Sequence, residues 1–219
     1  MHNGMAGDLE APDGAATSPS RAAERRERLV QAARTLFAEH GFHGAGIAQI
    51  ASLSGVKVGQ IYRDFANKEE IVGAIVETDL NAFLDEAALT AAISNGDAAA
   101  VRAWIWDLVL RKAHPAEAPL LPEILAESAR NERIAAIVSD TDRRVRGSLL
   151  SALAAFPVSP VCSERLAASA DLIMTVMMGL CSRQLARLQT DSAPLTSRVQ
   201  QIIDGEIDAI IAAPASERG

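Results

Sequence analysis

The feature that most constrains the fold is a pair of short apolar segments joined by a tight, glycine-containing turn. The segments span residues 47–54 and 57–64, and Ser54-Gly55-Val56 separates them. In the first segment Ile47, Ile50 and Ala51 fall on one helical face. Two short helices joined in this way form a helix-turn-helix, whose second helix can lie in the major groove of DNA. Plain helical packing gives the same spacing, so the spacing alone leaves both interpretations open.

Helical patterns flank this pair on both sides. A first helix is expected from Arg21 to Gly41, since glycine is a good residue just past a helix end. Asn67 as N-cap, with Glu70 three positions later, predicts the start of a long fourth helix that runs to the Ser94-Asn95-Gly96 break.

The rest of the chain also favours helices. Aromatic residues make up only 4% of the sequence, which disfavours a β-rich fold. Prolines near expected helix starts and ends divide the remainder. Further helices are predicted at about 97–113, 119–129, 131–156, 160–189 and 194–213. We therefore expect an all-α protein with about nine helices, preceded by a disordered tail over residues 1–20 that lacks hydrophobic periodicity.

Residues 28–76 resemble the N-terminal domain of the TetR/AcrR family of bacterial transcriptional regulators. This ordered signature covers about a quarter of the chain. The residues that carry it are Ala32-Ala33, Leu36-Phe37, Gly41-Phe42, Ile50-Ala51, Gly55-Val56, Gly59, Ile61-Tyr62, Phe65 and Lys68-Glu69.

The resemblance implies a specific domain organisation. A three-helix DNA-binding unit with a helix-turn-helix would occupy residues 21–68. The long fourth helix would join it to a larger helical domain over residues 69–213 for effector binding and dimerisation, with a C-terminal tail at 214–219. Beyond the signature, the remaining helices fit the family only in number, length and order.

The resemblance also implies which residues meet DNA. Gln60 could read adenine and Arg63 guanine through paired hydrogen bonds, and Gly59 would let the backbone approach DNA closely. Lys57 and Lys68 would act as point charges on phosphates. The full expected DNA-binding set is Lys57, Val58, Gly59, Gln60, Tyr62, Arg63, Lys68, His43, Gly44 and Arg28.

The sequence departs from the family pattern before the second helix and at the end of the third. Ala45 and Gly46 stand where hydroxyl residues are usual, so the backbone of His43 or Gly44 would have to supply that phosphate contact. Asp64 replaces a customary Tyr or His. The Asp64 carboxylate would repel phosphate unless it paired with a basic side chain such as Arg63 or accepted a hydrogen bond from a cytosine amino group.

Charge is distributed unevenly along the chain. The net charge of -7 taken alone argues against a nucleic-acid partner. Residues 21–68, however, hold eight basic and four acidic side chains, which gives +4. Residues 69–219 hold 13 basic and 21 acidic side chains, which gives -8. The one basic segment is therefore the helix-turn-helix, and the arginines that lead into the first helix could follow the DNA backbone.

The larger domain offers candidates for effector binding and for pairing. Methionine and aromatic side chains suit an adaptable apolar pocket, with a glutamate as an acidic wall. The expected ligand-binding set is Trp104, Leu108, Leu121, Glu127, Met174, Met177 and Met178. Apolar stripes on the last two helices predict a four-helix dimer interface, through Met178, Leu185, Ile203, Ile207 and Ile210. Each of these residues could instead be plain core.

Other functions find little support in the sequence. It has no phosphate-binding glycine loop, nucleophile elbow or zinc-protease motif, and its four histidines lack metal-ligand spacing. We therefore expect no catalysis, metal or cofactor. The longest apolar run, near residues 172–181, is shorter than the roughly 20 residues that span a bilayer, so we expect a cytoplasmic protein without membrane contact.

These observations predict a ligand-responsive, homodimeric repressor that binds palindromic double-stranded operator DNA and is released by a small apolar or amphipathic effector. Control of an efflux operon would fit the family's common use. One alternative is a DNA-binding regulator that has no small-molecule effector and acts through a protein partner. A helical-bundle enzyme is the other.

Overall fold

The computed structural model describes residues 20–110, 120–156, 163–186 and 193–212. Within these residues the chain forms ten α-helices and no strand, so the all-α prediction is confirmed. The predicted tails, apart from Ser20, lie outside the described residues. The helices are α1 (Arg21–Gly44), α2 (Ile47–Ser54), α3 (Val58–Asp64), α4 (Lys68–Leu84), α5 (Glu86–Ser94), α6 (Ala98–Leu110), α7 (Leu120–Ser128), α8 (Glu132–Ala154), α9 (Ser163–Leu185) and α10 (Ala193–Ile211).

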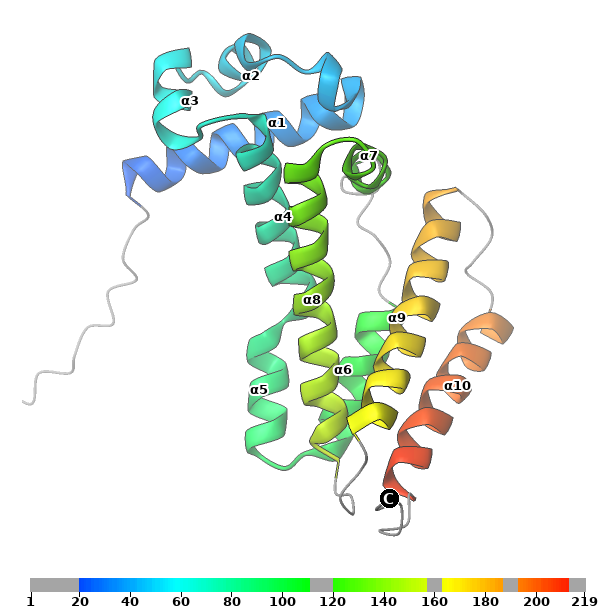
Figure 1. The fold of residues 1–219 in the computed structure, drawn as a ribbon. Coiled ribbons are helices and arrows are strands. Elements are labelled where there is room, and N and C mark those ends of the chain that lie inside the picture. Colours follow the sequence, from blue (N-terminus) through cyan, green and yellow to red (C-terminus); the bar gives the residue numbers. More distant parts are fainter. Residues whose placement is uncertain (1–19, 111–119, 157–162, 187–192, 213–219) are drawn as a thin grey trace, which may run out of the picture.

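The N-terminal helices form a unit at one end of the molecule. α1 lies across the top of the bundle, and α2 and α3 lie on the side of α1 that faces away from the bundle (Figure 1). The regular part of α1 ends at Gly41, whose φ of 71° and ψ of 170° are not helical. α4 then leads from this unit into the body. Asn67 caps it by accepting a hydrogen bond from the Glu70 N–H at 2.9 Å, as the sequence predicted.

The single long fourth helix that the sequence predicted is broken at Asp85. This residue adopts a left-handed conformation with φ 43° and ψ 54°, and it separates α4 from α5. Its side chain accepts a hydrogen bond from the Ala88 N–H at 3.3 Å and so caps α5. No glycine or proline lies between Gly73 and Gly96, so the sequence has no strong helix-end signal at this position.

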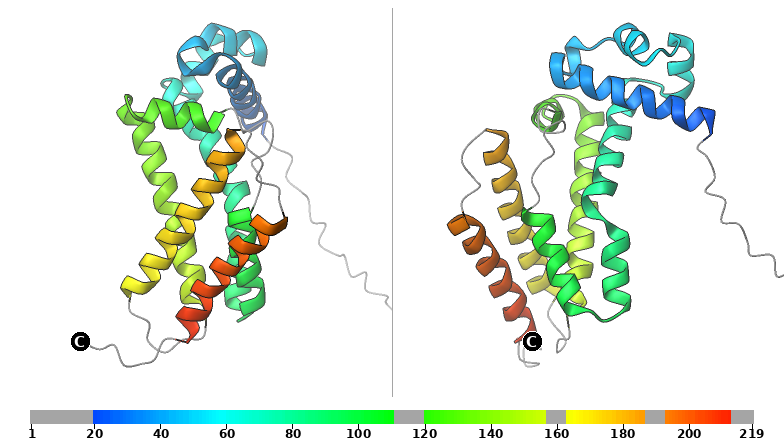
Figure 2. Two further views of the ribbon diagram at one scale, coloured as in Figure 1. Left: turned by 90° about the vertical axis from the view of Figure 1, so that its right-hand side faces the viewer. Right: turned by 180° about the vertical axis from the view of Figure 1, so that it is seen from behind.

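The body is a bundle in which α8 is central. α8 packs against α4 on one side and α9 on the other, and α10 packs against α9 and α6 (Figures 1 and 2). Its core joins side chains from six helices, α4–α6 and α8–α10, and includes Trp104, Ile105, Leu149 and Ile207. Arg102 on α6 links α6 to α10, because it pairs with Asp204 and Asp208, each at 2.7 Å.

A second core fills the N-terminal unit and extends beyond it. It holds buried side chains of α1 to α4, and also Leu120 and Ile124 of α7 and Ile134 of α8. Arg34 on α1 adds an ion pair with Asp79 on α4, whose Nη1–Oδ2 distance is 2.7 Å. The N-terminal unit is therefore packed firmly onto α7, α4 and the start of α8.

α9 is long enough and apolar enough, by length and composition alone, to cross a membrane. The sequence prediction considered only residues 172–181 and so did not anticipate this. A helix in the bundle of a water-soluble protein passes the same test. Here α9 packs against α8, α6 and α10, and Arg146 on α8 pairs with its Asp171 at 2.7 Å.

Candidate nucleic-acid interface

The turn between α2 and α3 has the geometry of a helix-turn-helix. Gly55 adopts a left-handed conformation with φ 69°, which a side chain would disfavour. The Ser54 hydroxyl donates to the Ile50 carbonyl at 2.7 Å and accepts from the Val56 N–H at 3.3 Å. Ile50, Val56 and Ile61 are buried in the N-terminal core, so both short helices are held by a few apolar side chains.

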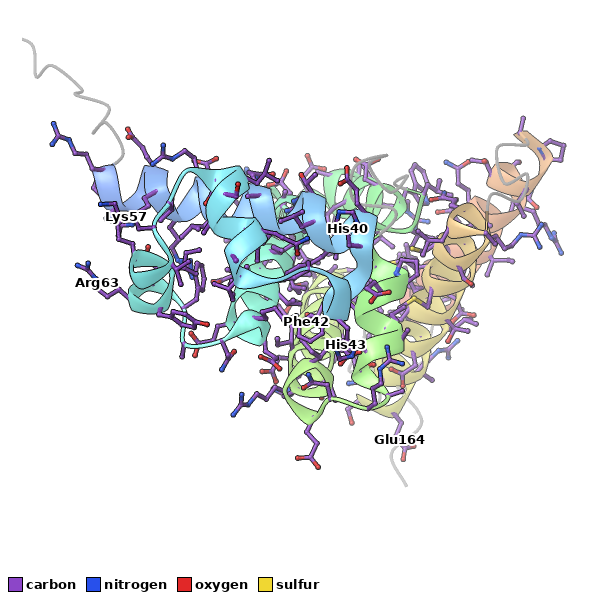
Figure 3. The ribbon with its side chains drawn as sticks, turned by 90° about the horizontal axis from the view of Figure 1, so that it is seen from above. His40, Phe42, His43, Lys57, Arg63 and Glu164 are labelled. Atoms are coloured by element: carbon purple, nitrogen blue, oxygen red, sulfur yellow. The ribbon has the colours of Figure 1, made fainter. Side chains whose placement is uncertain are left out.

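α3 and its N-cap residue Lys57 present five of the ten predicted DNA-binding residues to solvent. Tyr62 is 56% exposed and Val58 41% exposed, and Lys57, Gly59 and Arg63 are also exposed, whereas Gln60 is half-buried. Lys57 and Arg63 lie at the same end of the N-terminal unit, away from the bundle (Figure 3). The face combines donors, a phenol and an apolar side chain, which are the groups that read base edges and thymine methyls.

Leu53, at the end of α2, adds an apolar side chain that the sequence reading did not select. It is 55% exposed. Its position gave no signal, because helical periodicity places such a residue outside the core without saying what it faces.

Asp64 pairs with Arg25 of α1, and not with Arg63 as the sequence suggested. Arg25 Nε donates to Asp64 Oδ2 at 2.8 Å, and Arg25 Nη2 donates to Oδ1 at 2.9 Å. The hydrogen bond from Arg25, aided by the charges of Arg25, Arg26 and Arg63, holds the pKa of Asp64 below its ordinary value although burial opposes this. The Arg26 guanidinium lies 4.5 Å from the centroid of the Phe65 ring. Both arginines, which the sequence offered to phosphates, thus contact the end of α3.

Lys68 has a structural role in addition to the expected phosphate contact. Its ammonium group donates to the Phe42 carbonyl at 2.6 Å and to the Ala45 carbonyl at 3.0 Å, and it lies 4.5 Å from the centroid of the Phe42 ring. These carbonyls follow the regular part of α1, so Lys68 fixes the connection into α2.

The start of α2 compensates partly for the missing hydroxyl cap. Gly46 occupies the N-cap position and makes no side-chain hydrogen bond. The Gln49 side chain instead accepts from the Gly46 N–H at 2.7 Å. Gly44 and Arg28, two further members of the predicted DNA-binding set, are exposed.

The end of α1 is held by two carboxylates of α7. Glu123 Oε1 accepts from the Phe42 N–H at 2.8 Å, and Glu127 Oε2 lies 3.1 Å from His43 Nε2. Arg130 also donates to Glu127 at 2.7 Å. Burial raises the pKa of Glu127, but the hydrogen bond and charge of Arg130 together with His43 outweigh it, so this pKa lies below its ordinary value. His43, expected near DNA, therefore also joins the N-terminal unit to the body.

The structure divides the predicted ligand-binding residues into two groups. Trp104 and Leu108 are buried in the body core, and Met174 and Met177 pack against the same core. The Trp104 indole N–H donates to the Leu84 carbonyl at 2.7 Å, which satisfies it inside the core. Glu127, by contrast, lies on α7 and contacts His43 at the end of α1, and Leu121 is half-buried, also on α7.

The predicted dimer residues on α10 need a correction. Ile203, Ile207 and Ile210 are fully buried within the chain itself, because they pack against α6 and α9, and so they cannot form the surface that meets a partner. Met178 on α9 is 48% exposed, and Leu172 and Ile202 are exposed as well, while Leu185 is half-buried. Any pairing surface of these helices must use this outer side.

An open groove of about 820 Å³ lies between α4 and α8 and reaches Asp64 at the end of α3. It carries both carboxylates and arginines, among them Glu69, Glu77, Arg133 and Arg144, and it contains none of the predicted ligand-binding residues. No group of three or more possible metal ligands occurs within the described ranges.

The chain matches known regulators through its N-terminal part. Residues 29–75 match the family model described as bacterial regulatory proteins, tetR family. The HTH-type transcriptional regulator UidR of Escherichia coli (strain K12) is 29% identical over 117 residues, which are 52% of this chain and 57% of UidR. The HTH-type transcriptional repressor KstR2 of Mycolicibacterium smegmatis is 39% identical over 75 residues, which are 34% of this chain and 33% of KstR2. The match therefore spans little more than half of the length of UidR and about a third of the length of KstR2.

The fold extends the likeness over most of the chain. Salmonella enterica GusR superposes with a TM-score of 0.66 at 20% identity, covering 86% of this chain and 98% of GusR. At this level of identity the likeness shows the arrangement of helices alone.

Proposed function

Because this chain belongs, through its N-terminal domain, to the TetR family of bacterial transcriptional regulators, we propose that it is a homodimeric repressor that a small molecule releases from palindromic operator DNA. Members of this family are transcriptional regulators, typically repressors, and are not enzymes. Beyond regulation of transcription, we propose that this chain forms a dimer, binds an effector, recognises an operator and acts in the cytoplasm.

The observation that carries the proposal is the exposed outer face of α3. The side chains exposed to solvent there are Tyr62, Val58, Arg63 and Lys57, and they lie within residues 21–68, whose net charge is +4. Exposed aromatic and aliphatic side chains beside cations fit a major groove, which offers thymine methyls and base acceptors flanked by phosphates.

Pairing is proposed through the outer side of α9 and α10. Two helix-turn-helix units must reach half-sites about 34 Å apart, which one copy of this unit cannot do. Leu172, Met178 and Ile202 expose apolar surface on these helices. Such surface on two neighbouring helices suits a four-helix contact between two copies.

Effector binding is proposed for the body core around Trp104, Leu108, Met174 and Met177. Methionines can repack around ligands of different shape. An effector that separates α7 from α1 would disturb Glu123 and Glu127, which hold the end of α1. Couplings of roughly 1 to 3 kcal/mol are typical for such regulation. The regulated genes are proposed to form an efflux operon.

The alternative is a regulator that responds to a protein partner. The burial of Trp104 and Leu108 favours it, since both side chains already fill the body core. Release of operator DNA by any member of a panel of apolar and cationic compounds would exclude this alternative.

The direct test is to sequence genomic DNA fragments that the purified protein retains. We expect one palindromic site to be enriched. On that site Arg63→Ala should weaken binding about tenfold or more, as the loss of one base contact does, while leaving binding to unrelated DNA nearly unchanged. Lys57→Ala should weaken binding to both DNAs and lower the salt dependence by about one counterion. Absence of any enriched palindrome would contradict the proposed function.

A further inference from the structure

The recognition helix α3 is held by few contacts. It has seven residues, and Ile61 is its one buried side chain. Isolated helices shorter than about 12 residues are marginal in water, so the direction of α3 depends on what it packs against. One buried side chain fixes a point on the helix and leaves rotation about that point open. A second constraint is needed to fix where Tyr62 and Arg63 project.

The structure supplies this constraint at the C-terminal end of α3. Asp64 is the last residue of the helix, and its two carboxylate oxygens accept two parallel hydrogen bonds from Arg25. A two-pronged contact between guanidinium and carboxylate fixes direction as well as distance. Phe65 follows at once, buried and covered by the Arg26 guanidinium. The last residue of α3 and the C-cap residue that follows it thus contact two successive residues of α1.

Asp64 is otherwise badly placed for a DNA-binding helix. A carboxylate at a helix C-terminus opposes the helix dipole. It also lies next to Arg63, where its charge would repel phosphate. Considered by charge alone, Asp64 should weaken DNA binding, and its removal should strengthen it.

We propose that Asp64 is a positioning residue for DNA reading, because its contact with Arg25 sets the direction in which α3 presents Tyr62 and Arg63. The inference rests on the proposed function, since it assumes that α3 reads DNA. The positioning role predicts that loss of the Asp64 carboxylate lowers specific DNA affinity, whereas the loss of a negative charge alone would raise it. Specific binding should fall when the contact is lost, although a negative charge has been removed near the DNA.

The test compares Asp64→Asn with Glu27→Gln in the full-length protein. Glu27 is an exposed acid on α1, so its substitution removes the same charge from the same unit without altering the contact to α3. Affinity is measured on the palindrome enriched by the wild-type protein and on unrelated DNA at the same salt concentration. We expect Asp64→Asn to bind the palindrome about tenfold more weakly, since it replaces a charged hydrogen-bonded pair, and to bind unrelated DNA as well as before or better. Glu27→Gln should bind both DNAs slightly more tightly.

A double-mutant cycle with Arg25→Gln separates positioning from charge. If the pair acts as a unit, each single variant and the double variant lose about the same specific affinity. If the two charges act independently, Arg25→Gln weakens binding, Asp64→Asn strengthens it, and the double variant binds like the wild type. Circular dichroism and thermal unfolding verify that each variant folds, and Asp64→Glu, which retains the carboxylate, should recover part of the affinity.

The proposed function and the positioning role of Asp64 can be contradicted separately. If wild-type protein enriches no DNA site, the proposed function fails. If wild-type protein binds its site and folded Asp64→Asn binds that site equally or more tightly, the positioning role of Asp64 is overturned while the proposed function stands.

Discussion

At the scale of single residues, Gly41 has a backbone conformation that side chains exclude. Its φ of 71° and ψ of 170° lie in a region that is essentially reserved for glycine. A Cβ atom added there would lie 2.8 Å from Glu123 Oε1, the oxygen that accepts from Phe42 N–H. Both the conformation and the contact with α7 therefore require glycine.

We expect Gly41→Ala to lower the free energy of unfolding by about 2 to 3 kcal/mol, measured by urea denaturation. Gly59→Ala is the matched control. Gly59 lies inside α3 with open space where its Cβ would go, so this variant should be about 0.5 to 1 kcal/mol more stable than the wild type. Equal stability of Gly41→Ala and the wild type would show that the strain at this position is absent.

Residue-scale features that depend on local sequence were predictable. The left-handed turn at Gly55 and the cap at Asn67 follow from what glycine and asparagine do at helix ends. The partner of Asp64 was not predictable, because Arg25 lies 39 residues away and comes close only through the packing of α1 against the helix pair. Lys68 was missed as a carbonyl ligand for the same reason.

At the scale of helices, Asp85 converts one amphipathic pattern into two helices. The residue ends α4 in a left-handed conformation and caps α5 with its side chain. Asp and Asn tolerate this conformation better than other residues with side chains. The sequence predicted the existence of nearly every helix and placed most boundaries within a few residues, since those boundaries coincide with Gly, Pro or a cap. This break has only an aspartate to mark it.

Asp85→Ala removes the cap and retains the left-handed strain, so it should destabilise the protein by about 2 kcal/mol. Asp85→Asn retains the side-chain cap, and asparagine also tolerates the left-handed conformation. We expect its stability to lie within about 0.5 kcal/mol of the wild type. Thermal unfolding followed by circular dichroism compares the two. A loss in Asp85→Asn as large as that in Asp85→Ala would mean that the charge, and not the cap, stabilises this junction.

At the scale of the whole molecule, the proposed dimer depends on surface that one chain leaves uncovered. Met178→Asp places a charge on the exposed side of α9, and we expect it to convert the dimer into a folded monomer, measured by sedimentation velocity. A half-exposed site tolerates a charge within the chain, so the helical content should stay unchanged.

Ile203→Asp serves as the contrast to that variant. Ile203 is fully buried within the chain, so an aspartate there should lower the free energy of unfolding by several kcal/mol. The chain itself should then unfold, whereas Met178→Asp should only separate two copies. If Met178→Asp remained dimeric, pairing would use another surface.

The division of the molecule into two cores was only partly predictable. Helical periodicity placed Ile47, Ile50 and Ala51 on one face. Ile50 is buried in the N-terminal core, and Ile47 and Ala51 pack against it. Periodicity could not assign Leu120, Ile124 and Ile134 to that same core, because their order in the sequence places them with the body. Nor could it distinguish Ile203 from a surface residue that meets a partner, since both occupy one apolar stripe.

The shared N-terminal core limits how such a chain could exchange parts with its relatives. A recombination point at residue 68 would separate α1 to α3 from α7 and Ile134, leaving apolar side chains uncovered and Glu127 without His43. A transplanted DNA-reading unit would meet a foreign α7 at the end of α1 and a foreign start of α8. New operator specificity would therefore be acquired more readily by substitutions on the outer face of α3 than by replacement of the whole N-terminal unit.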